Sequence, residues 1–248
     1  MNSGSDAHLH FFPELLTENV GWQPSCALLN ATCEADWNLV AQAASRNAAI
    51  QPFFGIHPWW TETVAEGWDV RLAELLDRFP KAGIGEIGLD ALRKEVNSPE
   101  TVEAQKRLFR AQLELAVRWE RPVSVHCVRA WDWLWEPLRK TVGRAGQPIL
   151  FHAFSGSPEQ ITQILENFRW NAFFSLASFR FQPESRRFLR LLPTIPQDRL
   201  LLETDTDSQS DAQKIGEFYE KLSPILGLTP ERLAELTNQN LNRFLNRT

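Results

Sequence analysis

Two histidines near the amino terminus, His8 and His10 in the segment DAHLH, have the spacing of a pair of metal ligands. In a strand, residues i and i+2 point to the same face, so the two imidazoles would lie side by side. Two imidazoles provide half of a tetrahedral metal site. Two unrelated surface histidines would explain this segment equally well, so the prediction depends on further ligands elsewhere in the chain.

Further candidate ligands lie at or near the ends of apolar runs. They are Glu86 in GEIGLD, His126 in PVSVH, His152 in LFHAFSG and Asp205 in LLETD. A carboxylate buried at the end of an apolar strand is costly unless it is paired or bound to a metal. Separate ion pairs at each strand end would also satisfy these groups, but they require several independent coincidences. Mixed imidazole and carboxylate ligands suit zinc, magnesium or manganese, which the sequence does not rank.

Eight short apolar runs carry these side chains and are predicted strands. They cover residues 6–10, 26–30, 50–57, 82–90, 122–127, 148–154, 171–177 and 199–205. Amphipathic stretches alternate with them, among them 34–48, 70–80 and 98–120, the last with Ser98 as its predicted N-cap. This alternation favours a parallel sheet, and eight units can close a (β/α)8 TIM barrel of about 250 residues. The carboxyl ends of its strands meet at one mouth, where the candidate ligands fall.

Composition limits the remaining possibilities. The chain has 248 residues without a Gly/Ser-rich linker, so we expect a single domain over residues 1–248. Cys26, Cys33 and Cys127 form no CxxC pair, which favours a reducing compartment. The sequence has no signal-peptide pattern and no membrane-length apolar run. The prediction is a cytoplasmic α/β protein with no membrane contact and no evident obligate protein partner.

The net charge of −5 bears on nucleic-acid binding. It argues against a broad basic surface that neutralises many phosphates along a duplex, and few basic clusters are evident. A small phosphate site centred on metal ions is still compatible with this charge. We therefore expect weak affinity for long duplex DNA, whereas a frayed or single-stranded end could enter the mouth.

The ordered series DAHLH, GIHP, GEIGLD, PVSVHC, HAFSGS and LLETD resembles the TatD family of metal-dependent deoxyribonucleases, within the amidohydrolase-like barrels. The closing NQNLNRFL, with Asn240 and Phe244, is similar to the last helix of that family. The resemblance covers nearly the whole chain. It implies a barrel with one to three divalent ions at its mouth. The implied ligands are His8, His10 and Asp205 for one ion, His126 and His152 for a second, and Glu86 as the bridge between them.

The resemblance also implies roles beyond metal binding. Asp205 would orient or deprotonate the attacking water, and His57 in GIHPWW would touch the substrate phosphate, although a histidine held by Pro58 is the alternative. Trp59 and the next tryptophan could stack a base, but we expect at least one of them to pack in the core. Asp90 could orient a ligating histidine or serve only the structure.

Two departures from the family pattern concern the substrate. The arginine that usually lies two residues after the strand-five histidine is displaced by one, to Arg129, which is still a candidate substrate contact. After Asp205, a short acidic turn with Asp207 and Asp211 replaces the family's longer loop, and these acids would repel phosphates unless metal ions screen them.

We interpret the chain as a metal-dependent hydrolase that cleaves phosphodiester bonds at DNA ends through metal-activated water, with Asp205 and Glu86 as its catalytic residues. A hydrolase of a small ester, lactone or amide is an alternative, because this type of barrel supports many reactions. A metal-stabilised binding protein without turnover is a second alternative.

Overall fold

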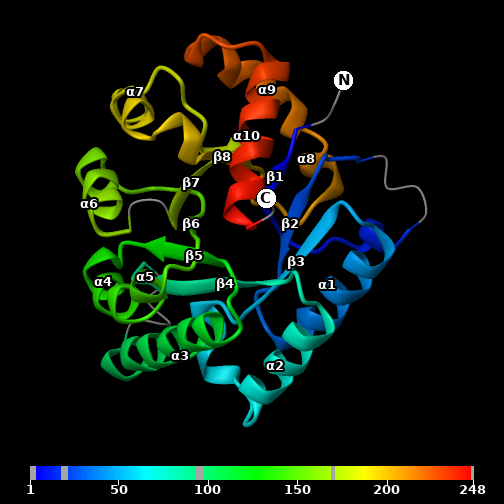
Figure 1. Cartoon of the computed structure of the whole chain (residues 1–248), viewed down its shortest axis with the longest axis vertical. Coiled ribbons are helices and arrows are strands. Elements are labelled where there is room, and N and C mark those ends of the chain that lie inside the picture. The colour runs from blue at the N-terminus through cyan, green and yellow to red at the C-terminus, as the bar shows by residue number, and fades with distance from the viewer. Residues whose placement is uncertain (1–3, 18–21, 93–97, 169–170, 247–248) are drawn as a thin grey trace.

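Eight parallel strands form one sheet in the part of the chain that the computed structural model describes, residues 4–17, 22–92, 98–168 and 171–246. Their order along the sheet follows the sequence. The strands are β1 (Asp6–Leu9), β2 (Ala27–Asn30), β3 (Ile50–Phe54), β4 (Gly83–Asp90), β5 (Val123–Val128), β6 (Ile149–Phe151), β7 (Ala172–Ala177) and β8 (Leu200–Glu203). Each falls within or overlaps one of the eight predicted runs, and the predicted α/β TIM barrel is confirmed (Figure 1).

The barrel closes between its last and first strands. The backbone N–H of Asp205 donates to the carbonyl of His8 at 2.9 Å, and the N–H of His10 donates to the carbonyl of Thr206 at 2.8 Å. Below these bonds, the carboxylate of Asp6 accepts from the backbone N–H of Thr204 at 3.0 Å and from its hydroxyl at 2.6 Å. These contacts hold the end of β8 beside the HxH segment of β1.

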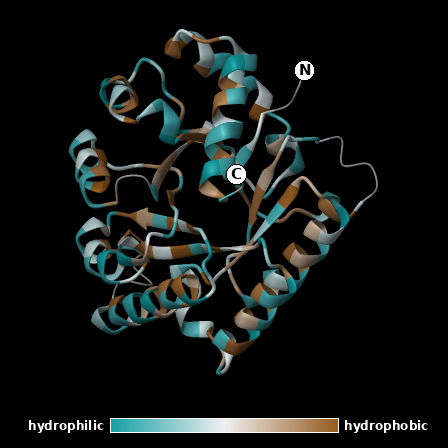
Figure 2. Cartoon of the chain, in the orientation of Figure 1, coloured by the Kyte–Doolittle hydropathy of each residue, from teal (hydrophilic) through white to brown (hydrophobic). Residues whose placement is uncertain are grey.

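Helices surround the strands, as Figure 1 shows. The α-helices are α1 (Glu34–Arg46), α2 (Trp68–Arg78), α3 (Pro99–Arg118), α4 (Trp131–Lys140), α5 (Val142–Ala145), α6 (Pro158–Phe168), α7 (Arg186–Leu191), α8 (Gln209–Ala212), α9 (Ile215–Leu222) and α10 (Pro230–Phe244). The short 3-10 segments are η1 (Pro13–Leu16), η2 (Pro58–Thr63), η5 (Ser178–Arg180), η6 (Leu192–Thr194), η7 (Gln197–Arg199) and η8 (Ser223–Leu226). These helices carry both hydrophobic and hydrophilic residues, consistent with one side facing the sheet and the other facing water (Figure 2).

Local sequence explains where individual helices start. Ser98 accepts a hydrogen bond from the backbone N–H of Thr101, so it caps α3 as predicted, and Pro99 occupies the first helical position. Thr229 caps α10 in the same way, through the N–H of Arg232. No helix among the described residues is both long and apolar enough to span a membrane.

The core consists of two buried layers. A large layer lies between the sheet and the helices, and a smaller one fills the barrel interior with residues that include Phe53, Phe173 and Phe244. The Phe244 ring from α10 packs on Phe53 and Phe173, with centroids 6.0 and 5.6 Å away. The buried Asn240 amide donates to the carbonyls of Gln197 and Leu200, at 2.7 and 2.8 Å. The last helix is therefore fixed to the barrel by apolar packing and by hydrogen bonds.

Candidate metal centre

The six predicted metal ligands meet at the carboxyl end of the barrel. His8 lies in β1 and His10 directly follows that strand, while Glu86 and His126 lie in β4 and β5. His152 directly follows β6. Asp205 lies two residues after β8. Glycine at position 88 lets β4 approach β5 closely, because its φ is +150° and a Cβ there would collide with the backbone carbonyl of His126.

Glu86 is at the centre of this group, and its two carboxylate oxygens face different histidines. Oε1 lies 2.7 Å from His126 Nδ1 and 2.7 Å from His152 Nε2. Oε2 lies 3.5 Å from His8 Nε2 and 3.5 Å from His10 Nε2. One buried carboxylate thus has imidazoles next to both of its oxygens, with His57 Nε2 a further neighbour of Oε1 at 3.4 Å, which is an arrangement expected of a bridging ligand.

Asp205 completes the side of the centre formed by the HxH pair. Its Oδ1 lies 3.4 Å from His10 Nε2 and 3.8 Å from His8 Nε2. The Asp205 side chain is 18% exposed, whereas the Glu86 side chain is 4% exposed. Asp205 is therefore the carboxylate of this pair with more access to solvent.

Hydrogen bonds behind the imidazoles fix their orientation. His10 Nδ1 donates to the carbonyl of Asn30 at 3.1 Å, so its Nε2 is directed toward the two carboxylates. His8 Nδ1 pairs with the hydroxyl of Ser124 at 3.0 Å. The His8 ring also stacks on the His152 ring, with centroids 3.9 Å apart. These contacts hold the rings in place without using the nitrogens that face Glu86 and Asp205.

The charges of the centre reinforce one another. Burial raises the pKa of Glu86, but the surrounding imidazoles outweigh it and hold that pKa well below the usual range. Burial lowers the pKa of His10, yet the hydrogen bond to Asp205 and the charge of Glu86 raise it overall to about 9. Burial also raises the pKa of Asp205, and the hydrogen bond from His10 outweighs it, so that pKa is lowered. Both carboxylates are therefore ionised, which is the form that binds cations.

The donor set fits divalent ions. In the triads His8–Glu86–His152 and His8–His10–Asp205, one donor atom from each residue lies within 4.8 Å of the others. The buried Nε2 of His8 has no hydrogen-bond partner among the described residues. A buried polar atom without a partner costs about 1–3 kcal/mol, and a cation would satisfy this nitrogen. Donors of this type suit zinc, manganese or magnesium.

Two acidic residues at this end of the barrel were not among the predicted site residues. Glu203 is fully buried in β8, its Oε1 lies 3.5 Å from His152 Nδ1, and it accepts from the N–H of Ala153 at 2.8 Å. Asp6 is buried below His8, and burial raises its pKa to about 7. A sequence signal existed for both residues, because each lies two positions before a predicted ligand and so shares its strand face.

Asp90 lies next to His126, a proposed metal ligand. This position fits the first of its two expected roles, which was to orient a ligating histidine. Its Oδ2 lies 3.5 Å from His126 Nε2 and accepts from the indole N–H of Trp59 at 2.7 Å. Burial raises the pKa of Asp90, but bonds from His126 and from the backbone N–H of Leu92 outweigh it, so that pKa is lowered. The ionised Asp90 joins β4, β5 and the segment after β3.

His57 lies against the metal centre in a defined tautomer. It directly precedes η2, its Nε2 lies 3.4 Å from Glu86 Oε1, and its Nδ1 accepts from the backbone N–H of Trp59 at 3.2 Å. Burial lowers the pKa of His57 to about 4, so the ring is neutral at pH 7. A neutral imidazole with an accepting Nδ1 carries its hydrogen on Nε2. His57 therefore presents an N–H donor, rather than a lone pair, to the centre.

The expectation that at least one of Trp59 and Trp60 packs in the core is wrong. Trp59 and Trp60 are 44% and 41% exposed, and both line a cavity of about 410 Å³ that contains the metal centre. They remain at the surface because η2 is a short turn over the mouth, rather than an amphipathic helix packed on the sheet.

The structure does not bring Arg129 into this cavity. Arg129 is exposed and lies in a groove beside it, because the displacement by one residue puts it past the end of β5. Of the two acids after β8, Asp207 lines the cavity, whereas Asp211 forms an ion pair with Lys214 at 2.6 Å. Asp207 is therefore the acid with a direct effect on the mouth.

Comparisons with known proteins agree with this architecture. A family model described as TatD related DNase matches residues 6–246. Cut9-interacting protein scn1 of Schizosaccharomyces pombe is 25% identical over 301 residues, covering 87% of this chain and 90% of that protein. The 3'-5' ssDNA/RNA exonuclease TatD of Klebsiella pneumoniae is 32% identical over 184 residues, covering 72% of this chain and 65% of that protein.

A solved structure supports the fold over the full length. The TatD homologue YJJV from Escherichia coli K12 matches with a TM-score of 0.79 at 22% identity, covering 98% of each chain. The family model spans nearly all of the sequence, and the barrel places the family's ordered motifs around one mouth. This chain belongs to the family of TatD-related DNases.

Proposed function

We propose that this protein is a metal-dependent phosphodiesterase that shortens single-stranded DNA or RNA from an end. The observation that carries the proposal is the position of Glu86, with one oxygen next to His126 and His152 and the other next to His8 and His10. Membership of a DNase family supports a phosphodiester as the bond that is cleaved. A relative named as a 3'-5' ssDNA/RNA exonuclease supports a single-stranded substrate.

In this proposal, His8, His10 and Asp205 would hold one ion, His126 and His152 would hold a second, and Glu86 would serve both. When bound, such ions polarise phosphoryl oxygens and lower the pKa of water. Glu203, 3.5 Å from His152 Nδ1, keeps that imidazole oriented.

Asp205 is the proposed general base. It is ionised, and it is more exposed to solvent than Glu86, so a water molecule can reach it from the mouth. An Asp205 carboxylate oxygen takes a proton from the attacking water as the water oxygen bonds to phosphorus and the ester P–O bond breaks, and the departing oxygen then takes a proton from solvent. Glu86 is too enclosed by imidazoles to perform this step, and it holds the ligands around it together instead.

His57 and Trp59 are the proposed substrate contacts. The Nε2–H of His57 can donate to a phosphate oxygen beside the centre, because its other nitrogen is occupied by the backbone. The exposed indole of Trp59 offers a face on which a terminal base can stack. A cavity of about 410 Å³ has the size of a site for one small ligand, which matches a single nucleotide at a strand end better than a duplex.

The test is an activity panel on the purified protein with zinc, manganese or magnesium added separately. The substrates are end-labelled single-stranded DNA, RNA and blunt duplex DNA, beside small esters, lactones and amides. We expect stepwise shortening of single strands that a chelator abolishes. Turnover of a small ester, lactone or amide without any nucleic-acid cleavage would contradict the proposal, and so would the absence of turnover throughout the panel.

A further inference from the structure

A groove of about 740 Å³ lies on the same side of the barrel as the metal centre. Five arginines line it, although the chain has a net charge of −5. Its walls come from the segments that follow β4, β5, β6 and β7, together with the starts of α4 and α6 and with α7. The arginines that line it, which we call the arginine groove, are Arg129, Arg180, Arg186, Arg187 and Arg190. Glu159 is the acidic residue among its lining residues.

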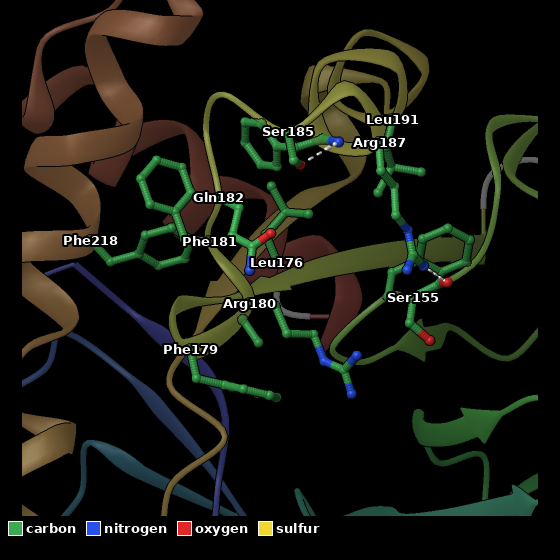
Figure 3. Close-up of a pocket in the computed structure, with 13 residues that line it drawn as sticks. Ser155, Leu176, Phe179, Arg180, Phe181, Gln182, Ser185, Arg187, Leu191 and Phe218 are labelled. Atoms are coloured by element: carbon green, nitrogen blue, oxygen red, sulfur yellow. Dashed lines mark hydrogen bonds between the residues drawn. The ribbon is translucent and has the colours of Figure 1, made fainter. Parts of the chain in front are cut away.

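Two residues that line the groove follow proposed metal ligands closely in the sequence. Arg129 lies three residues after His126, and Ser155 lies three residues after His152. Arg187 reaches from α7 to the carbonyl of Ser155, to which its guanidinium donates a hydrogen bond (Figure 3). The same guanidinium has further N–H donors available. The groove therefore continues from the carboxyl ends of β5 and β6, on the same face as the mouth.

The packing of α7 fixes the direction of its arginines. Phe188 and Leu191 are buried, which turns Arg187 and Arg190, at the same spacing of three, toward the outside. Ser185 caps the helix by accepting from the N–H of Phe188 at 3.1 Å. The short helix thus has a fixed apolar side in the core and a positive side toward the groove.

Carboxylates neutralise little of this charge. Arg190 lies 3.4 Å from Glu159, but both side chains are 71% exposed, and an ion pair of this kind is weak in water. Within the described residues, Arg129, Arg180 and Arg186 have no carboxylate at ion-pair distance. Repulsion between like charges destabilises a folded protein. Binding of an anionic ligand would offset the repulsion among these arginines.

An aromatic ring accompanies the arginines. Phe179 lies in η5, just outside the residues that line the groove, and is 61% exposed; the guanidinium of Arg180, which does line the groove, lies 5.0 Å from the centre of its ring. Figure 3 shows both side chains extending from the same segment. Cationic grooves with exposed aromatic rings are typical of single-strand binding sites, where phosphates contact the cations and bases stack on the rings.

We infer that the arginine groove binds the backbone of a single-stranded nucleic acid, at the nucleotides next to the one held in the metal centre. The inference rests on the proposed function, which requires a strand to extend from the mouth. Four of its five arginines lie within residues 180–190, a basic segment that is visible in the sequence, but only the structure places this segment in one groove with Arg129. The expectation that few basic clusters exist is corrected at this face of the molecule.

The test compares Arg186→Ala/Arg190→Ala with a control, Arg107→Ala/Arg110→Ala, in the full-length protein. Both pairs are exposed, and the control pair lies on α3 among Glu103, Glu114, Asp132 and Glu136. The first measurement is kcat/KM for an oligonucleotide of about 12 nucleotides, relative to kcat/KM for bis(4-nitrophenyl) phosphate. The second is the Kd of a labelled oligonucleotide by fluorescence anisotropy, at several salt concentrations and with chelator present to prevent cleavage.

For the groove variant we expect the kcat/KM ratio to fall about tenfold and the Kd to rise about tenfold, because two phosphate contacts are lost. The slope of log K against log salt should decrease by about 1.4, since each phosphate contributes about 0.7 for a single strand. The control should match the wild type, and unchanged melting temperatures should show that both variants fold. Wild-type binding and salt slope in the groove variant would overturn the inference. Absence of any wild-type cleavage would refute the proposed function instead, and the anisotropy measurement would still decide the groove.

Discussion

Replacing Glu86 by glutamine removes one charge from the centre of the site while keeping the shape of the side chain. In the structure, one Glu86 oxygen bonds to His126 and His152 at 2.7 Å, and the other faces His8 and His10 at 3.5 Å. The amide can offer one oxygen, whereas the carboxylate offers two. The side toward one of the histidine pairs would then meet an N–H donor instead of an acceptor.

The expected magnitude follows from the contacts that are lost. A hydrogen bond to a charged group contributes about 1.5–3 kcal/mol, and breaking a buried ion pair by removing one partner costs about 3–5 kcal/mol. A loss of about 3 kcal/mol in the affinity for ions corresponds to roughly a hundredfold, at about 1.4 kcal/mol per factor of ten. We therefore expect Glu86→Gln to lose at least one ion during purification.

The assay is metal content per chain by elemental analysis, with affinity measured by competition against a chromogenic chelator. Circular dichroism shows whether the variant is folded, and Glu136→Gln, on the exposed surface of α4, is the matched control for loss of one negative charge. If folded Glu86→Gln kept the wild-type metal content and affinity, Glu86 would not bridge the centre.

Substitutions at three further residues test the roles assigned to them. Asp205→Asn should retain metal while kcat for phosphodiester cleavage falls by a factor of about 10²–10⁴, because an amide cannot accept the proton of the water; near wild-type turnover would refute the role as base. Trp59→Ala should raise KM for single-stranded DNA by an amount equivalent to about 1–3 kcal/mol, whereas Trp59→Phe, which keeps a ring but loses the bond to Asp90, should bind like the wild type if stacking is the role. Asn240→Ala should lower the free energy of unfolding by about 1–3 kcal/mol, because two buried carbonyls lose their donor, with no change in metal content; chemical denaturation and elemental analysis measure both.

The fold was predictable because its signals are local and repeated. Each of the eight strands is a short buried run, and amphipathic stretches separate the runs, so the order along the chain leads directly to the barrel. The convergence of His8, His126 and Asp205 followed from the same geometry, since the carboxyl ends of parallel barrel strands share one mouth. The single domain over residues 1–248, the cytoplasmic location and the identity of the metal ions stay predictions.

What the sequence did not reveal depends on contacts between distant segments. Glu203 shares a strand face with Asp205, which the sequence could have indicated, but its contact with His152 comes from a distant strand and is seen only in the structure. The basic segment 180–190 is visible in the sequence, but its position beside Arg129 and the segment after His152 depends on packing between distant parts of the chain. The exposure of Trp59 depends on the path of η2 over the mouth, and hydrophobicity alone would place that side chain in the core.

The most direct test of the shared metal centre is a crystal structure of the protein with manganese, with the ions located by anomalous scattering. We predict two peaks, one on each side of Glu86, each within bonding distance of a Glu86 oxygen and of the facing imidazole nitrogens. One peak should lie among His8, His10 and Asp205, and the other beside His126 and His152. Ions bound elsewhere, or a Glu86 carboxylate directed away from the ion held by His8 and His10, would contradict the account.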